Sequence, residues 1–98
     1  MTYQVLCTFD LKNASRADYA TAYSELSKLG FSHTVQGSSR VVALPTTTVI
    51  GSFGGVNAAG VRDDLRARIV QAFAAQGFKF EVFVSVGGPD HTWGSHTN

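Results

Sequence analysis

Cysteine, charge and long apolar runs are all scarce in this sequence. Cys7 is the only cysteine among 98 residues, which excludes an internal disulfide and a zinc site built from cysteines. Charged residues make up 15% of the chain, eight basic and seven acidic, so its composition is neither disordered nor strongly basic. No apolar run approaches the roughly 18 residues of a membrane span, and residues 1–9 lack the basic start of a signal peptide. We therefore expect one small globular domain in the cytoplasm, without a membrane partner.

The N-terminal third of the chain predicts a strand followed by a helix. Residues 3–9 alternate between an apolar face and a mixed face, which is typical of a strand. Ser15 and Asp18 have the spacing of a capping box, in which each side chain satisfies the other residue's backbone amide. Apolar residues then recur at helical spacing up to Gly30, which suits a left-handed C-cap. The spacing predicts a helix over 15–29.

The middle of the chain predicts further strands and a loop. Residues 31–44 are rich in Ser, Thr and Val, and they indicate two strands or one bent strand with a turn at 36–39. Residues 46–50 could extend a strand at an edge. Four glycines fall between positions 51 and 60, so we expect most of 51–60 to be a loop.

The C-terminal third predicts a second helix, a last strand and a tail. Asn57 is a plausible N-cap, and a helix ending at Gly77 would bury a stripe of residues four apart, namely Val61, Leu65, Ile69 and Phe73. Residues 78–86 alternate as a strand does, and Gly87-Gly88-Pro89 ends it.

These elements follow the order β-α-β-β-α-β, which predicts a ferredoxin-like α+β fold over residues 1–88, with a polar tail at 89–98. Two right-handed crossovers would put both helices on one face of an antiparallel sheet. The opposite face, with Leu6, Thr8 and Phe83, would remain open. An open face with apolar side chains favours self-association, so we expect a homodimer.

Three short motifs within residues 3–44 carry a family resemblance. They are Phe9-Asp10-Leu11, then Tyr19-x-x-x-Tyr23-x-x-Leu26-x-Lys28-Leu29-Gly30-Phe31, and finally Gln36-Gly37-Ser38. In these motifs the chain resembles the virulence-associated protein D family and the related small CRISPR-associated endonuclease-fold subunit. The second helix and the last strand agree with these families in order but not in motif.

The resemblance implies a homodimer and a function. In these families an acidic residue at the end of the first strand faces its symmetry mate across the dimer cleft. Asp10 matches it and would be the catalytic residue and the ligand of a divalent metal such as Mg²⁺. Ser38 matches the families' serine and would contact a phosphate as a second catalytic residue. The implied function is a metal-dependent endoribonuclease of the toxin type, acting on RNA or DNA.

Each of these residues also has a purely structural interpretation. Asp10 could cap the strand-to-helix turn, because aspartate bonds amides two residues further on. Ser38 could be a bulge serine bonded to the backbone. His91 and His96 are too loosely spaced and too close to the end for a metal site. The buried environment expected for Cys7 makes it a small hydrophobic residue rather than a nucleophile.

Basic residues offer a candidate nucleic-acid surface. Arg40, Arg62 and Arg66 are its main candidates, with Arg68 and Lys79 in addition. Acidic residues lie among them and dilute any positive field, so a solvated helix face is the alternative. Phe83 could stack on bases or pack in a dimer. The second functional hypothesis is a non-catalytic homodimeric interaction module that keeps the fold without nuclease activity.

Overall fold

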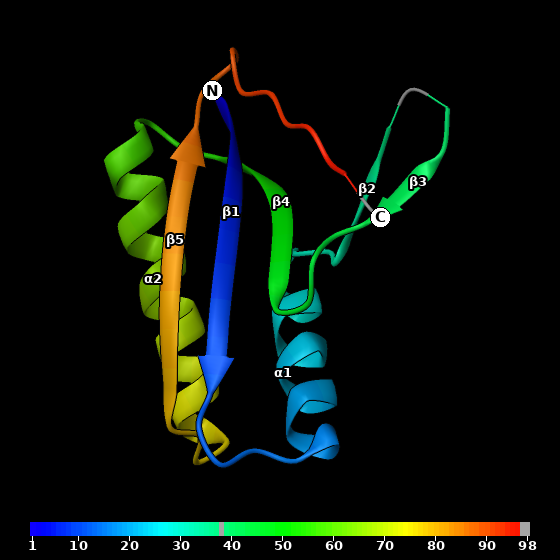
Figure 1. Ribbon diagram of the computed structural model, residues 1–98. Coiled ribbons are helices and arrows are strands. Elements are labelled where there is room, and N and C mark those ends of the chain that lie inside the picture. The colour runs from blue at the N-terminus through cyan, green and yellow to red at the C-terminus, as the bar shows by residue number, and fades with distance from the viewer. Residues whose placement is uncertain (38, 97–98) are drawn as a thin grey trace.

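A three-stranded antiparallel sheet with two helices against one of its faces forms the centre of the molecule (Figure 1). The computed structural model describes residues 1–37 and 39–96. Along the chain the elements are β1 (Thr2–Leu11), α1 (Arg16–Leu29), β2 (Thr34–Gln36), β3 (Val41–Ala43), β4 (Thr48–Gly54), α2 (Ala58–Ala75) and β5 (Phe80–Gly87). The strand order is β4-β1-β5, and β2 and β3 form a separate two-stranded sheet. The prediction of an α+β fold with an antiparallel sheet is confirmed.

The alternation of β1 determines which face of the sheet is covered. Tyr3, Val5, Cys7, Phe9 and Leu11 are buried in the core, whereas the residues between them are more exposed. The predicted stripe of α2 is buried against them, as are Ala22 and Leu26 of α1. Both helices therefore cover the same face of the sheet, and the face with the even-numbered residues of β1 is the open face.

Aromatic rings fill the lower part of this core. Phe73 of α2 is fully buried and meets the rings of Phe9, Phe78 and Phe80 edge-on, with centroids 5.4–5.7 Å apart. Such contacts stabilise the core beyond the burial of their area alone. They anchor the end of β1 that carries Asp10.

The caps of α1 agree with the sequence prediction. The Ser15 hydroxyl accepts from the Asp18 amide at 3.2 Å, and the Asp18 carboxylate accepts from the Ser15 amide at 3.0 Å. Gly30 adopts a left-handed conformation with φ 109°, and the Phe31 amide donates to the Leu26 carbonyl. Asn57 caps α2 as predicted, accepting from the Gly60 amide at 2.7 Å.

The prediction of a loop over most of 51–60 was wrong for residues 51–54. β4 runs through Gly51 to Gly54 and pairs with β1 in register, from Thr2 opposite Gly54 to Thr8 opposite Thr48. β4 thus takes the place in the main sheet that the predicted order gave to residues 31–44. Those residues form the two strands β2 and β3 instead, with a bridge from Ser32 to Ile50 as their link to β4.

The β2–β3 hairpin and the C-terminal segment flank one side of the open face. The hairpin projects from the sheet, and residues 88–96 run from the end of β5 toward it (Figure 1). Residues 91–95 line an apolar groove of about 330 Å³ together with Leu6, Val42 and Ile50. This explains why Ile50 is buried although it belongs to the open face. Among the described residues, no helix is long and apolar enough to cross a membrane.

Candidate functional site

The open face of β1 and β5 carries three successive cross-strand pairs with different chemistry. Thr8 lies opposite Phe83, and Asp10 lies opposite Glu81. One step further, the Lys12 amide donates to the Lys79 carbonyl at 2.9 Å, which continues the same pairing. Successive pairs on one face of a strand are roughly 7 Å apart. An aromatic layer, a carboxylate layer and a lysine layer therefore follow each other toward the C-terminal end of β1.

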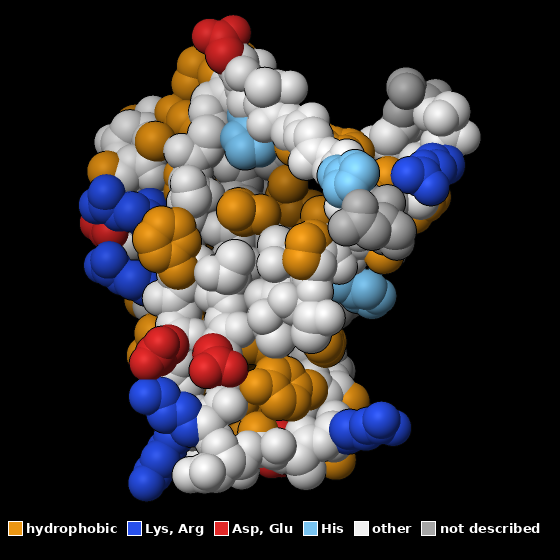
Figure 2. Space-filling view, viewed as in Figure 1, with side chains coloured by type: hydrophobic (Ala, Val, Ile, Leu, Met, Phe, Trp, Pro, Cys, Tyr) orange, Lys and Arg blue, Asp and Glu red, His pale blue; other side chains and the backbone are white. Residues whose placement is uncertain are grey.

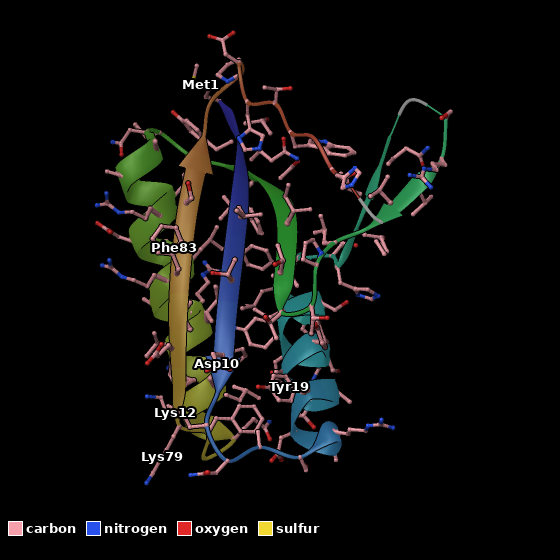
Figure 3. The ribbon with its side chains drawn as sticks, viewed as in Figure 1. Met1, Asp10, Lys12, Tyr19, Lys79 and Phe83 are labelled. Atoms are coloured by element: carbon pink, nitrogen blue, oxygen red, sulfur yellow. The ribbon has the colours of Figure 1, made fainter. Side chains whose placement is uncertain are left out.

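Figure 3 shows this order, with Phe83 nearest the middle of β5, then Asp10, then Lys12 and Lys79 at the end of the sheet. In Figure 2 acidic side chains gather on this part of the face, with basic side chains below them and an exposed hydrophobic side chain above. The first two layers, together with Thr47, line a depression of about 470 Å³.

Asp10 is exposed and is held by a neighbour from α1. The Tyr19 hydroxyl lies 3.3 Å from Asp10 Oδ1 and 3.1 Å from the Leu11 carbonyl oxygen, and it accepts from the Leu11 amide at 3.3 Å. Tyr19 thus fixes the end of β1 and orients the Asp10 carboxylate. The structural interpretation of Asp10 as a cap of the turn has no hydrogen bond to support it among the described residues, since none joins its carboxylate to a backbone amide.

The lysine layer is only partly neutralised. Lys12 Nζ lies 3.0 Å from Glu81 Oε1, with both side chains largely exposed. An exposed pair of this kind contributes little to stability. Lys79 is exposed and has no ion pair within residues 1–37 and 39–96. Like charges directly opposite each other destabilise a strand pair, and here they occur in two adjacent layers, at Asp10–Glu81 and at Lys12–Lys79.

The donor chemistry of the carboxylate layer fits Mg²⁺. This cation prefers oxygen ligands and keeps several waters, so it needs only one or two carboxylates from a protein. Asp10 and Glu81 are such a pair. The part of the chain that the structure describes holds no group of three or more His, Cys, Asp or Glu side chains suited to a metal. Further ligands would have to come from water, from a phosphate or from a second copy.

The other candidates from the sequence are not gathered at this site. Ser38 lies outside the described residues. Arg40 is exposed immediately before β3, in the projecting hairpin. Arg62 and Arg66 lie on α2, which covers the opposite face of the sheet, and both contact Asp63 Oδ1, at 2.9 and 3.3 Å. Hydrogen bonding to Arg62 lowers the pKa of Asp63, and the same bond raises the pKa of Arg62.

The remaining titratable candidates do not join the site either. His91 lies at the other end of β5, against Gly87. Burial raises the pKa of the Cys7 thiol from 9.0 to about 12, which keeps the thiol protonated and unreactive at neutral pH. The sequence prediction that Cys7 belongs to the core is confirmed.

The sequence interpretation missed Glu81 as the partner of Asp10. The strand alternation does place both residues on the open face. Their direct opposition depends on the register between β1 and β5, which join residues some 70 positions apart in the chain. A shift of two residues would preserve the faces and separate the carboxylates, so only the fold identifies this pair.

Comparisons with protein-family models, with curated proteins and with solved structures found no match to this chain. The structure itself defines the class: a small α+β protein with helices on one face of an antiparallel sheet and a polar, carboxylate-bearing site on the other.

Proposed function

We propose that this chain is a small, cytoplasmic, homodimeric protein that associates with nucleic acid and cleaves RNA with a divalent cation bound at Asp10. The observation that carries the proposal is the direct opposition of Asp10 and Glu81 on the open sheet face, in a depression. The resemblance to the virulence-associated protein D family points to the same residue and to activity of the toxin type. We further propose that the fold is a variant of the ferredoxin-like arrangement, with the Ser32–Ile50 bridge marking the place of a fourth strand.

The residues around the carboxylates have distinct roles in this proposal. Tyr19 orients Asp10 by hydrogen bonding, and Lys12 holds Glu81. A bound Mg²⁺ would lower the pKa of a coordinated water and offset the charge on the reacting phosphate. In the proposed dimer Asp10 of each copy faces one shared cleft, which the nucleic acid enters. Arg40 would contact the phosphate backbone there, and Ser38 would have the phosphate contact that the resemblance implies.

A second function is favoured by the ion pairs of the basic residues. Arg62 and Arg66 are both engaged by Asp63, and Lys12 is engaged by Glu81. Internally paired charges attract a polyanion less than free ones. This pattern suits a non-catalytic homodimeric interaction module.

The test combines solution mass with cleavage. Light scattering gives the oligomeric state, and the same sample is assayed on RNA and DNA with Mg²⁺ and with EDTA. We expect a dimer whose RNA cleavage is lost in EDTA and in Asp10→Asn, while Asp64→Asn, which alters an exposed carboxylate of α2, cleaves normally.

The other outcomes decide between the hypotheses. Cleavage by Asp10→Asn at the wild-type rate would remove Asp10 from the mechanism. A stable dimer that neither binds nor cuts nucleic acid would favour the interaction module. A strict monomer would refute the shared cleft.

A further inference from the structure

We infer that the three layers of the open face form a binding track for single-stranded nucleic acid, in which a base stacks on Phe83 and the phosphate backbone reaches the Lys12–Lys79 pair. The inference rests on the proposed function and names its substrate class, an unpaired strand. It also assigns binding to residues at the sheet, away from the arginines of α2.

Phe83 provides the first observation. Its side chain is 65% exposed, on the open face next to Thr8 and inside the depression that contains Asp10. The ring is therefore open to contact from solvent, beside the carboxylate layer. Proteins that bind single strands use exposed aromatic rings on a sheet for stacking, because every base has an apolar face while a duplex hides it.

Lys79 provides the second observation. It is a cation without an ion pair within the described residues, placed opposite Lys12 on the neighbouring strand. Glu81 engages Lys12, so Lys79 is the lysine of this layer whose charge is left for an anion. A phosphate bound at Lys79 would offset that charge and reduce the repulsion between the two lysines.

The order of the layers provides the third observation. The carboxylates of Asp10 and Glu81 lie between Phe83 and the lysines. A cation bound to these carboxylates would offset their negative charge at the point where the nucleic-acid backbone passes over them. Phe83 of β5 and Lys79, which directly precedes β5, are four residues apart, which corresponds to roughly 14 Å of extended chain. A span of this size requires a short oligonucleotide rather than a single nucleotide. The three layers therefore match a nucleic-acid strand in which one base contacts Phe83 and a phosphate further along the strand contacts Lys79.

A second copy of the chain is the other possible cover for Phe83. The lysine layer favours nucleic acid, because Lys79 offers a phosphate a positive charge that no ion pair within residues 1–37 and 39–96 offsets. Measurement of both nucleic-acid binding and dimer formation in Phe83→Leu distinguishes the two occupants.

Binding is measured by fluorescence anisotropy with a labelled oligouridine of about ten nucleotides, in a buffer that contains CaCl₂. A DNA oligonucleotide of the same length and an RNA duplex are measured under the same conditions. We expect the single strands to bind more tightly than the duplex. Phe83→Leu should weaken binding by about tenfold or more, because it keeps an apolar side chain but removes the stacking ring. Phe83→Tyr should keep the wild-type affinity.

The lysine is tested by its salt dependence. Lys79→Gln should lower the slope of log K against log salt by about 0.7, the value for one lost contact to a single-stranded phosphate. Lys28→Gln is the matched control, because Lys28 is exposed on α1 and pairs with Glu25; it should leave the slope unchanged.

Several results would overturn the inference. These are equal affinity of wild type and Phe83→Leu, equal slopes in Lys79→Gln and wild type, or a duplex bound as tightly as the single strand. Loss of the dimer in Phe83→Leu would assign the ring to a contact between copies. Because binding is scored without cleavage, Phe83-dependent binding with no cleavage would refute the proposed nuclease and leave the binding track standing.

Discussion

Gly51 is the position where a single methyl group most directly tests the packing of β4. Its backbone is extended, so an alanine would meet no conformational penalty there. A Cβ atom at Gly51 would, however, lie 2.7 Å from the Gly30 carbonyl oxygen and 2.7 Å from the Phe53 ring. The ring could turn away, but the carbonyl belongs to the cap of α1 and cannot. Gly51→Ala should therefore push β4 away from the end of α1.

The magnitude follows from two opposing effects. Replacing glycine by alanine at a compatible position stabilises a protein by about 0.4–1 kcal/mol, because the unfolded chain loses freedom. Forcing a methyl group into a filled space costs about 1–3 kcal/mol. The steric cost is larger at Gly51, since a backbone atom must move. We expect net destabilisation of about 1–2 kcal/mol, which lowers the Tm of a chain of this length by roughly 4–16 °C.

Gly54 offers a matched control in the same strand. A Cβ atom there has no neighbour nearer than the Met1 carbonyl oxygen at 4.0 Å, so only the favourable effect operates. Gly54→Ala should leave stability unchanged or raise it by about 0.5 kcal/mol. Urea unfolding followed by circular dichroism measures both variants. Equal stability of Gly51→Ala and Gly54→Ala would refute the close approach of β4 to the α1 cap.

Two further predictions concern the core thiol and the first helix. The pKa of the Cys7 thiol is raised from 9.0 to about 12 in the folded protein. The unfolded chain therefore loses the thiol proton at lower pH than the folded protein does. The free energy of unfolding should fall as the pH rises above 9, by about 1.4 kcal/mol at pH 10. Urea titrations at pH 8 and pH 10 should show this loss in wild type and a smaller one in Cys7→Ala; the same loss in both would mean that other groups cause it. Ser15→Ala removes the hydroxyl that accepts from the Asp18 amide and should cost about 1 kcal/mol. Ser27→Ala, at an exposed position of the same helix, should cost nothing. Thermal unfolding distinguishes the two variants, and equal Tm values would contradict the cap.

Local signals determined much of the fold from the sequence. The alternation of β1 identified its buried face, the four-residue spacing in α2 identified its core stripe, and Ser15 and Gly30 marked the ends of α1. Each of these signals acts between residues close in the chain, where sterics and hydrogen bonding leave few alternatives. The open face and the exposed Phe83 follow from the same alternation.

The resemblance and the place of Asp10 at the end of β1 made it a candidate from the sequence, but the sequence did not predict its surroundings. The sequence does not reveal that α1 brings Tyr19 to its carboxylate, nor that Arg62 and Arg66 share one aspartate on the far side of the sheet. The resemblance covers residues 3–44, whereas Glu81 and Lys79 come from the other end of the chain.

The tertiary structure alone decided the membership of the sheet and the composition of the site. Glycines at 51 and 54 predicted a loop, yet both lie in β4 and pair with β1. Position 51 needs a glycine because the Gly30 carbonyl leaves no room for a side chain. In the same way, Asp10 faces Glu81 because β5 docks on β1 in one register out of several that bury the same apolar residues. The sequence by itself fixes faces through short-range geometry. Register and neighbourhood depend on packing between distant segments, which only the folded chain specifies.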